Sequence, residues 1–174
     1  LSNIKENSEA IGHQPAKDIE WHFDGSGVET KHLATCLYGV EIPKQGGDTL
    51  FANGYLSLNA LPPALSKQVK SLSITYSRLY LYERLGYAKK LSTEELAQFS
   101  DVTKPLVVTH PVTQREALVF SIEECKCIDG MNESQSYEFL SQLLEFITAE
   151  NQIYRHQWSV GDLLVWDNRC MMHT

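Results

Sequence analysis

Several features that would place a protein in a membrane or on nucleic acid are missing from this sequence. No apolar run approaches the roughly 18–20 residues that cross a bilayer, and no charged segment followed by an apolar one opens the chain as a secretion signal would. No basic run stands out, and 15 Lys and Arg residues against 22 Asp and Glu residues leave a net charge of -7. We therefore expect no membrane and no nucleic-acid partner, with the cytoplasm as the default location.

Cysteine is also scarce. The sequence has four cysteines, none of them in a Cys-x-x-Cys pair typical of a zinc or redox site: Cys36, Cys125, Cys127 and Cys170. Free thiols in a reducing compartment are the expected state. No internal repeat, low-complexity tract or heptad is present, so the sequence leaves the oligomeric state open.

The composition is that of a soluble globular protein, with 43% hydrophobic and 21% charged residues. A chain of 174 residues is long enough to bury a sizeable core. We expect residues 1–174 to form a single domain.

Short strands with turns between them dominate the pattern. β-branched, aromatic and alternating residues predict a strand at 32–42, ended by Pro43, and another at 49–53 after the turn 44–48. Two hairpins are expected, one from 105–111 and 116–122, and one from 152–158 and 163–168 across the turn 159–162.

Helices are fewer and grouped. We expect two short pieces within 58–72, separated at Pro62-Pro63, a helix at 93–99 after a capping box of Ser92 and Glu95, and a longer helix at 133–149. In the last, Asn132 is a plausible N-cap, and an apolar stripe is assigned to the core: Tyr137, Leu140, Leu143, Leu144 and Ile147. Grouped helices between short strands favour a mainly β fold, a β-sandwich or jelly roll with helical insertions.

The stretch Glu20-Trp21-His22-Phe23-Asp24-Gly25 carries the first chemical signal. Side chains two apart in an extended strand share a face, with Cα atoms roughly 6.5–7 Å apart. An imidazole and a carboxylate can therefore converge on one ion. Taken alone, the pattern His22-x-Asp24 is more often a surface pair or a satisfied half-buried histidine than a metal site.

Three further pieces follow in a consistent order: the turn Gly46-Gly47-Asp48-Thr49, the segment around 109–120, and Trp166-Asp167-Asn168-Arg169 followed by His173. This order resembles the taurine dioxygenase family (the TauD/TfdA-like group) of Fe(II)- and 2-oxoglutarate-dependent oxygenases, over nearly the whole chain. The resemblance implies a double-stranded β-helix, the cupin-like form of the jelly roll.

The resemblance also implies a metal triad of His22, Asp24 and His173. Two imidazoles and one carboxylate leave three positions of an octahedron open, as is typical of non-haem iron oxygenases. By resemblance these positions take 2-oxoglutarate and O2, and a small-molecule substrate is hydroxylated or desaturated while 2-oxoglutarate becomes succinate and CO2. Thr49 matches the family's hydroxyl donor to the far carboxylate of 2-oxoglutarate.

The tail departs from the family pattern. Members continue past the second histidine into a strand whose arginine pairs with the distal carboxylate of 2-oxoglutarate, whereas this chain stops at Thr174. Arg169 precedes His173 and matches a structural arginine. We therefore expect that the chain is incomplete at both ends.

The tyrosine-rich segment 75–87 falls where the family places an insertion over the substrate. Tyr80, Tyr82 and Tyr87 are candidates to line an aromatic pocket, which favours an aromatic or amino-acid-derived substrate such as a natural-product isonitrile. The remaining histidines are expected to be structural or at the surface: His13, His32, His110 and His156. Trp166, Asp167 and Asn168 fit groups that orient the metal ligands.

Two other classes of function stay open. A jelly roll with the same triad could bind a metal and a small molecule without turnover, and a zinc hydrolase could use the three ligands with a metal-bound water. The hydrolase needs a general base, and no Glu adjoins the motif as it does in His-Glu-x-x-His.

Overall fold

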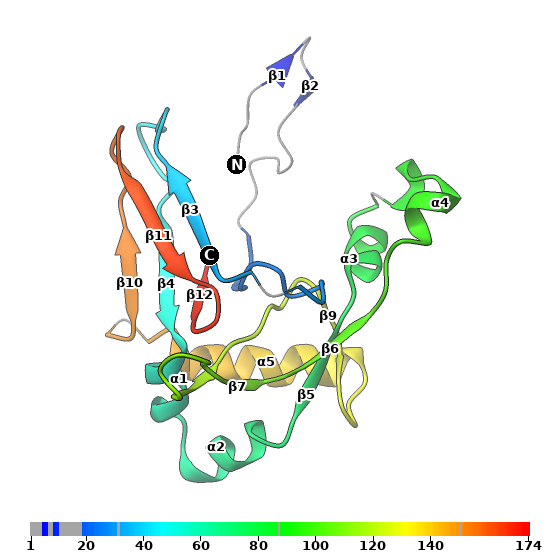
Figure 1. Cartoon of the computed structure of the whole chain (residues 1–174), viewed down its shortest axis with the longest axis vertical. Coiled ribbons are helices and arrows are strands. Elements are labelled where there is room, and N and C mark those ends of the chain that lie inside the picture. Colours follow the sequence, from blue (N-terminus) through cyan, green and yellow to red (C-terminus); the bar gives the residue numbers. More distant parts are fainter. Residues whose placement is uncertain (1–4, 7–8, 11–18, 31, 87, 150) are drawn as a thin grey trace.

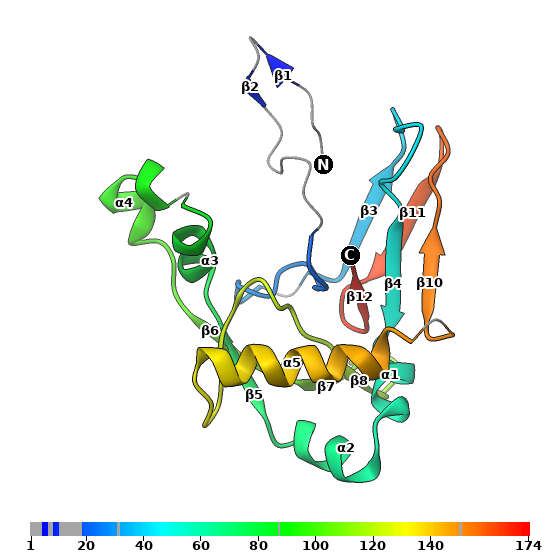
Figure 2. The ribbon, with the colours of Figure 1, turned by 180° about the vertical axis from the view of Figure 1, so that it is seen from behind.

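The computed structural model describes residues 5–6, 9–10, 19–30, 32–86, 88–149 and 151–174. Small antiparallel sheets make up its frame, and one long helix, α5 (Glu133–Ile147), crosses below one group of their strands (Figure 1). The opposite view shows the same division, with one group of strands above one end of α5 and two short helices beyond its other end (Figure 2). Within the described part of the chain, no helix is both long and apolar enough to span a membrane.

Two sheets carry the residues of the proposed site. In the first, β4 (Thr49–Asn53) lies between β10 (Ile153–His156) and β12 (Met171–His173). In the second, β3 (Ala34–Tyr38) pairs with β11 (Leu163–Asp167). All of these pairings are antiparallel and join segments far apart in the sequence.

The hairpin expected from 152–158 and 163–168 is wrong. Both strands form, but β10 pairs with β4 and β11 pairs with β3, so consecutive strands enter different sheets. The link between them is closed by Asp162, whose carboxylate accepts from Ser159 N at 2.8 Å and lies 3.1 Å from His156 Nε2. Asp162 O also accepts from Gly39 N, which ties the link to the end of β3. Local turn chemistry therefore fixed the bend, while partners elsewhere in the chain fixed the pairing.

A third sheet was not expected from the sequence. In it β5 (Ser73–Tyr76) lies between β6 (Val102–Pro105) and β9 (Cys125–Ile128). The first predicted hairpin is confirmed in shortened form, as β7 (Val107–Thr109) paired with β8 (Glu116–Leu118). A further short pair, β1 (Lys5–Glu6) and β2 (Glu9–Ala10), lies near the amino terminus.

The helices follow their capping residues. α1 (Gly54–Ala60) begins earlier than expected because the Asn53 side chain accepts from Tyr55 N and Leu56 N. α2 (Pro63–Val69) begins at the predicted proline break. The other short elements are α3 (Arg78–Arg84), which was not expected, a single 3₁₀ turn at Ala88–Lys90, and α4 (Thr93–Leu96), which has the predicted capping box.

The main core lies where α5 packs against β9 and α1. Leu140, Leu143 and Ile147 are fully buried, as the stripe predicted. Tyr137 is the exception, since it is exposed, and the inward place one residue earlier belongs to Ser136, whose hydroxyl accepts from Ile128 N at 2.9 Å. The asparagine cap at Asn132 is confirmed, with Gln135 completing a capping box.

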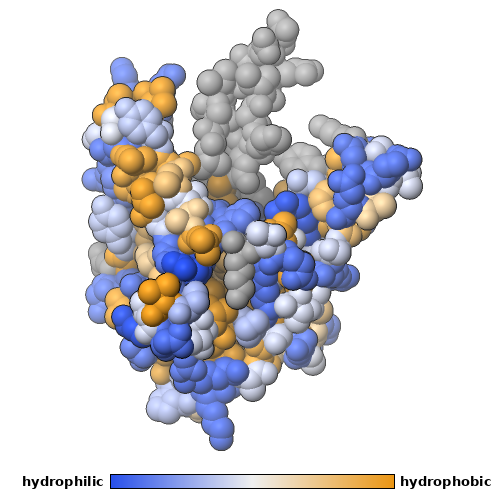
Figure 3. Space-filling model, viewed as in Figure 1, coloured by the Kyte–Doolittle hydropathy of each residue, from blue (hydrophilic) through white to orange (hydrophobic). Residues whose placement is uncertain are grey.

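One face of the β3–β11 sheet is apolar and uncovered in the described structure. Tyr38, Leu163 and Val165 each keep more than half of their surface exposed, and Figure 3 shows hydrophobic side chains over the end of the molecule where these strands lie. Alternation along the strands places Thr35 and Trp166 on the opposite, inner face.

Replacing Leu143 by alanine tests the core. The side chain is fully buried, so Leu143→Ala should lower the free energy of unfolding by about 2–5 kcal/mol through lost burial and a residual cavity. Gln142→Ala, on the exposed side of the same helix, should change it by less than about 0.5 kcal/mol. Urea unfolding measures both, and equal effects would contradict the packing of α5.

Candidate functional site

His22 and His173 are direct partners across an antiparallel bridge. His22 N donates to His173 O at 3.0 Å, and His173 N donates to His22 O at 2.8 Å. Residues paired in this way project their side chains to the same face. The two rings accordingly lie together, with centroids 4.1 Å apart.

Asp24 completes the group from two residues beyond His22. Its Oδ1 lies 3.6 Å from His22 Nε2 and 3.7 Å from His173 Nε2. One ligand atom from each of the three side chains falls within 4.8 Å of the others. The structure therefore brings together the three residues that the sequence proposed as a metal triad.

The hydrogen bonds of His22 settle which nitrogen can act as a ligand. Its Nδ1 lies 2.8 Å from Glu20 O, an acceptor, so Nδ1 carries the proton in the neutral ring. Nε2 then presents a lone pair toward the Asp24 carboxylate. Nδ1 of His173 is buried without a hydrogen-bond partner among the described residues.

The protonation states of Asp24 and His173 favour a bound cation. Burial opposes ionisation of Asp24, but the neighbouring His22 imidazole and the Thr35 hydroxyl outweigh it and lower the pKa of Asp24 to about 2. Burial, with the adjacent His22, lowers the pKa of His173 to about 4. Burial also opposes protonation of His22, yet Asp24 and the Glu20 carbonyl raise the pKa of that ring. At neutral pH the site therefore holds an ionised carboxylate and a neutral His173.

The donor set fits a divalent transition metal. Imidazole nitrogen and carboxylate oxygen are its usual ligands, and two histidines with one carboxylate are the set found in non-haem Fe(II) oxygenases. Three acceptor atoms that face one another within a few ångströms repel unless a proton or cation lies between them. His22, Asp24 and His173 would hold the metal.

A hydrogen-bonded chain leads from β11 to Asp24. Trp166 Nε1 donates to Asn168 Oδ1 at 3.1 Å, and Asn168 Nδ2 donates to Thr35 Oγ1 at 2.7 Å. The Thr35 hydroxyl donates in turn to Asp24 Oδ2. Thr35 was not singled out from the sequence, although alternation places it as the inward-facing polar residue of an otherwise apolar strand.

Thr49 lies on the same face as the triad. Phe51 pairs directly with His173, and Thr49 is two residues from Phe51 on β4, so all three side chains share one side of the sheet. Trp158 Nε1 donates to Thr49 Oγ1 at 3.0 Å. Because an indole N–H is only a donor, the Thr49 hydroxyl hydrogen is available for another acceptor. Trp158 was not identified from the sequence.

A second group of possible metal ligands, His110, Asp167 and Cys170, has a structural role instead. His110 Nδ1 accepts from Val112 N and Thr113 N, so Nε2 carries the proton and donates to Asp167 Oδ2 at 3.0 Å. Asp167 also binds Arg169, which is the first cause of its lowered pKa. Burial raises the pKa of the neighbouring Cys170 thiol and keeps it protonated. His110 therefore holds β11 to the loop after β7.

Two of the other histidines lie outside the triad. His156 lies between Tyr154 and Asp162 and closes the link after β10. His32 is exposed. His13 lies outside the described residues.

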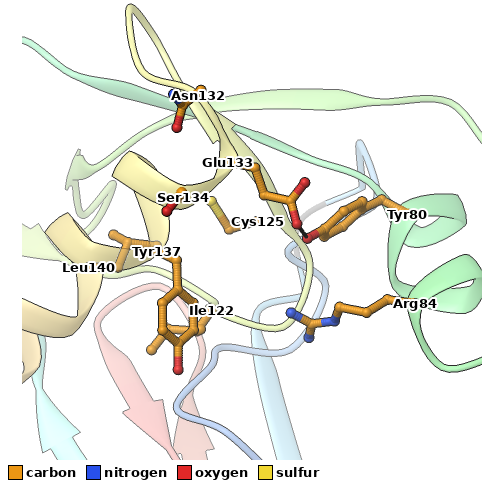
Figure 4. A pocket seen from close by; sticks show the side chains of 9 residues that line it. All are labelled: Tyr80, Arg84, Ile122, Cys125, Asn132, Glu133, Ser134, Tyr137 and Leu140. Atoms are coloured by element: carbon orange, nitrogen blue, oxygen red, sulfur yellow. Dashed lines mark hydrogen bonds between the residues drawn. The ribbon is translucent and has the colours of Figure 1, made fainter.

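A cavity of about 520 Å³ lies between α3 and the first turn of α5 (Figure 4). Tyr80 and Arg84 line it from α3, and the Tyr80 hydroxyl donates to Glu133 at 2.5 Å. Tyr82 instead packs edge-on against Phe99, with centroids 5.3 Å apart. Tyr87 lies outside the described residues. A shared aromatic pocket for the three tyrosines stays a prediction.

A smaller cavity of about 150 Å³ is lined by Asp24 itself. Its walls combine apolar side chains with basic ones, among them Phe23, Val108, Val119, Lys104 and Arg169. A small organic molecule in this space would lie beside the triad.

Comparison with known proteins gives one consistent result. The family model described as "Taurine catabolism dioxygenase TauD, TfdA family" matches residues 2–174. The chain is 33% identical to the alpha-ketoglutarate-dependent 2,4-dichlorophenoxyacetate dioxygenase of Cupriavidus pinatubonensis, over 88% of this chain and 53% of that protein. It is 28% identical to the (S)-phenoxypropionate/alpha-ketoglutarate-dioxygenase of Delftia acidovorans, over 99% of this chain and 64% of that protein.

Solved structures agree with this result. A putative alpha-ketoglutarate dependent 2,4-D dioxygenase from Burkholderia xenovorans matches with a TM-score of 0.78 at 33% identity, over 88% of this chain and 58% of that chain. AAD-2 in complex with Mn(II) and N-oxalylglycine matches with a TM-score of 0.78 at 31% identity, over 88% and 59%. The chain thus spans less than two thirds of the length of these relatives.

Removing the carboxylate of Asp24 tests the metal site. Asp24→Ala should weaken Mn(II) binding by more than about 100-fold, since a charged ligand is lost outright. Asp101→Ala, which removes a surface ion pair with Lys126, is the matched control and should bind as the parent does. Calorimetric titration measures both, and undiminished binding by Asp24→Ala would remove this residue from the site.

Proposed function

The chain belongs to the taurine catabolism dioxygenase TauD, TfdA family, and from that membership we propose that it acts as an Fe(II)- and 2-oxoglutarate-dependent dioxygenase. The observation that carries the proposal is the convergence of His22, Asp24 and His173, whose ligand atoms lie within 4.8 Å of one another. The relatives are named as alpha-ketoglutarate-dependent dioxygenases.

Each member of the triad has a defined part. His22 and His173 supply Nε2 atoms, and Asp24 supplies Oδ1 and the negative charge that offsets the metal. The chemistry that bound iron(II) supplies is the activation of O2, coupled to conversion of 2-oxoglutarate to succinate and CO2. One oxygen atom enters succinate, and the other enters the substrate on hydroxylation or leaves as water on desaturation. Because Asp24 is present, no ligand position is freed for a halide.

Thr49 is proposed to bind the cosubstrate. Its hydroxyl hydrogen is free because Trp158 fills the acceptor side of Oγ1, and its side chain shares the face of His173. Donation to a carboxylate of 2-oxoglutarate would be a charge-assisted hydrogen bond. The relative that was crystallised with Mn(II) and N-oxalylglycine, an amide isostere of 2-oxoglutarate, supports a cosubstrate site of this kind.

For the substrate we propose a small organic acid with an aromatic or amino-acid-derived body. The cavity beside Asp24 offers Phe23, Val108 and Val119 to an apolar body, and the basic residues Lys104 and Arg169 also line it. Two relatives are named for the aryloxy acids phenoxypropionate and 2,4-dichlorophenoxyacetate. Tyr80, on the wall of the larger cavity, stays a candidate contact.

We also propose that residues 1–174 form a single domain built on a double-stranded β-helix. The support is the alternation of strands between the β10-β4-β12 sheet and the β11-β3 sheet, with β10 in the first, β11 in the second and β12 in the first again. Such alternation is how two antiparallel sheets wind into a jelly roll.

Anaerobic reconstitution with Fe(II) tests the function. Addition of 2-oxoglutarate should produce a charge-transfer band near about 500 nm, as expected of a 2-oxo acid chelated to this metal, and His22→Ala should lose the band. Release of succinate on admitting O2 then separates an oxygenase from a binding protein. If the parent protein binds iron but shows no band, the result would favour a non-catalytic binding protein or a zinc hydrolase.

Thr49 has its own test. Thr49→Ala should raise the concentration of 2-oxoglutarate needed for half-maximal band intensity by about 10–100-fold, the loss of one hydrogen bond to a charged group. Thr49→Ser should restore it, and Thr103→Ala, at an exposed threonine of β6, should leave it unchanged. An unchanged requirement in Thr49→Ala would remove this residue from the cosubstrate site.

A further inference from the structure

The two oxygens of the Asp24 carboxylate have different surroundings. Oδ1 faces both histidines, whereas Oδ2 accepts the hydroxyl hydrogen of Thr35. We propose that Thr35, held by Asn168, is a positioning residue that makes Asp24 a one-oxygen ligand. The inference rests on the metal site proposed above and adds a residue to it.

The donor and acceptor of each hydrogen bond between Trp166, Asn168, Thr35 and Asp24 are fixed. Trp166 Nε1 can only donate, and so can the Asp24 backbone N–H, which lies 3.3 Å from the same Asn168 oxygen. Asn168 must therefore point Oδ1 at these two donors and turn Nδ2 toward Thr35. Thr35 accepts from Nδ2, so its single hydrogen is left for Asp24 Oδ2. No alternative amide orientation satisfies both donors.

The residues of this hydrogen-bond network are held in place by the pairing of β3 with β11. Thr35 and Trp166 are paired directly across β3 and β11, so their side chains share the inner face. Asn168 N donates to Leu33 O and continues the ladder by one step. Trp166 and Asn168 are almost fully buried. A buried and fully satisfied network of this kind holds its members in one arrangement.

The consequence concerns how many positions around a metal remain open. If Asp24 binds through Oδ1 alone, the triad fills three positions of an octahedron and leaves three, which is the number that a two-atom chelator and O2 require. If Oδ2 also bound, one of those positions would be lost. The hydrogen bond from Thr35 holds Oδ2 away from the metal. Thr35 therefore keeps the third position open and also orients Asp24.

The test compares Thr35→Val with Thr35→Ser in the full chain. Valine keeps the shape but removes the hydroxyl, and serine keeps the hydroxyl. Co(II) is the probe, since calorimetry gives its dissociation constant and its visible spectrum reports coordination number without turnover. Thr35→Val should weaken Co(II) binding by about 10–100-fold, as is typical when a group that orients a ligand is lost, and should change the spectrum.

Thr35→Ser should return both readouts to those of the parent, and Thr103→Val, at an exposed threonine, should leave both unchanged. Thermal unfolding of the metal-free variants shows which are folded, and Thr35→Ala replaces the valine variant if that one is not. A folded Thr35→Val or Thr35→Ala with the parent's dissociation constant and spectrum would overturn the role of Thr35.

The parent and Asp24→Ala separate this outcome from failure of the site itself. If the parent binds no Co(II), or if Asp24→Ala binds it as well as the parent, the metal site is wrong and the positioning role falls with it. If the parent binds, Asp24→Ala does not, and Thr35→Val matches the parent, the metal site stands and the positioning role alone is refuted.

Discussion

The antiparallel pairing of His22 with His173 is the contact on which the site depends. Its two backbone hydrogen bonds set both imidazoles on one face, and the alternation of an extended chain then carries Asp24 to the same place. The pairing is itself secured by β4, which holds β12 in register and carries Thr49 on the same face. A shift of one residue in that register would turn His173 away from Asp24 and dissolve the triad.

The charges of Asp24 and His173 are compatible with a cation beside this contact. The acidic member stays ionised through the His22 imidazole and the Thr35 hydroxyl, and His173 stays neutral because it is buried beside His22. Asp167, by contrast, has a structural role, since it is bound by Arg169 and His110. The two carboxylates therefore differ in use: Asp167 is saturated by donors from Arg169 and His110, whereas Asp24 directs Oδ1 at the two histidines.

Features set by residues close together in the sequence could be predicted, whereas features set by distant residues mostly could not. Helix caps and helix breaks could be predicted because they depend on neighbouring residues, as with Asn132 at α5 and the prolines before α2. The triad was readable because its motif and order match a known family. The pairing of β10 and β11 was not, because β4 and β3 outcompeted a short turn that looked sufficient for a hairpin. Thr35 was missed for the same reason, since its role depends on Asn168 from the far end of the chain.

Joining His22 to His173 closes a loop that contains most of the described chain. Closing so long a loop costs conformational entropy before any contact within the site repays it, which places this pairing late in folding. In an unfolded chain His173 lies far from His22 and Asp24, so a cation that needs all three ligands binds the folded state more tightly than the unfolded state. Bound metal would then act as a non-covalent crosslink between His173 and the segment 22–24, and its free concentration would set part of the protein's stability by mass action.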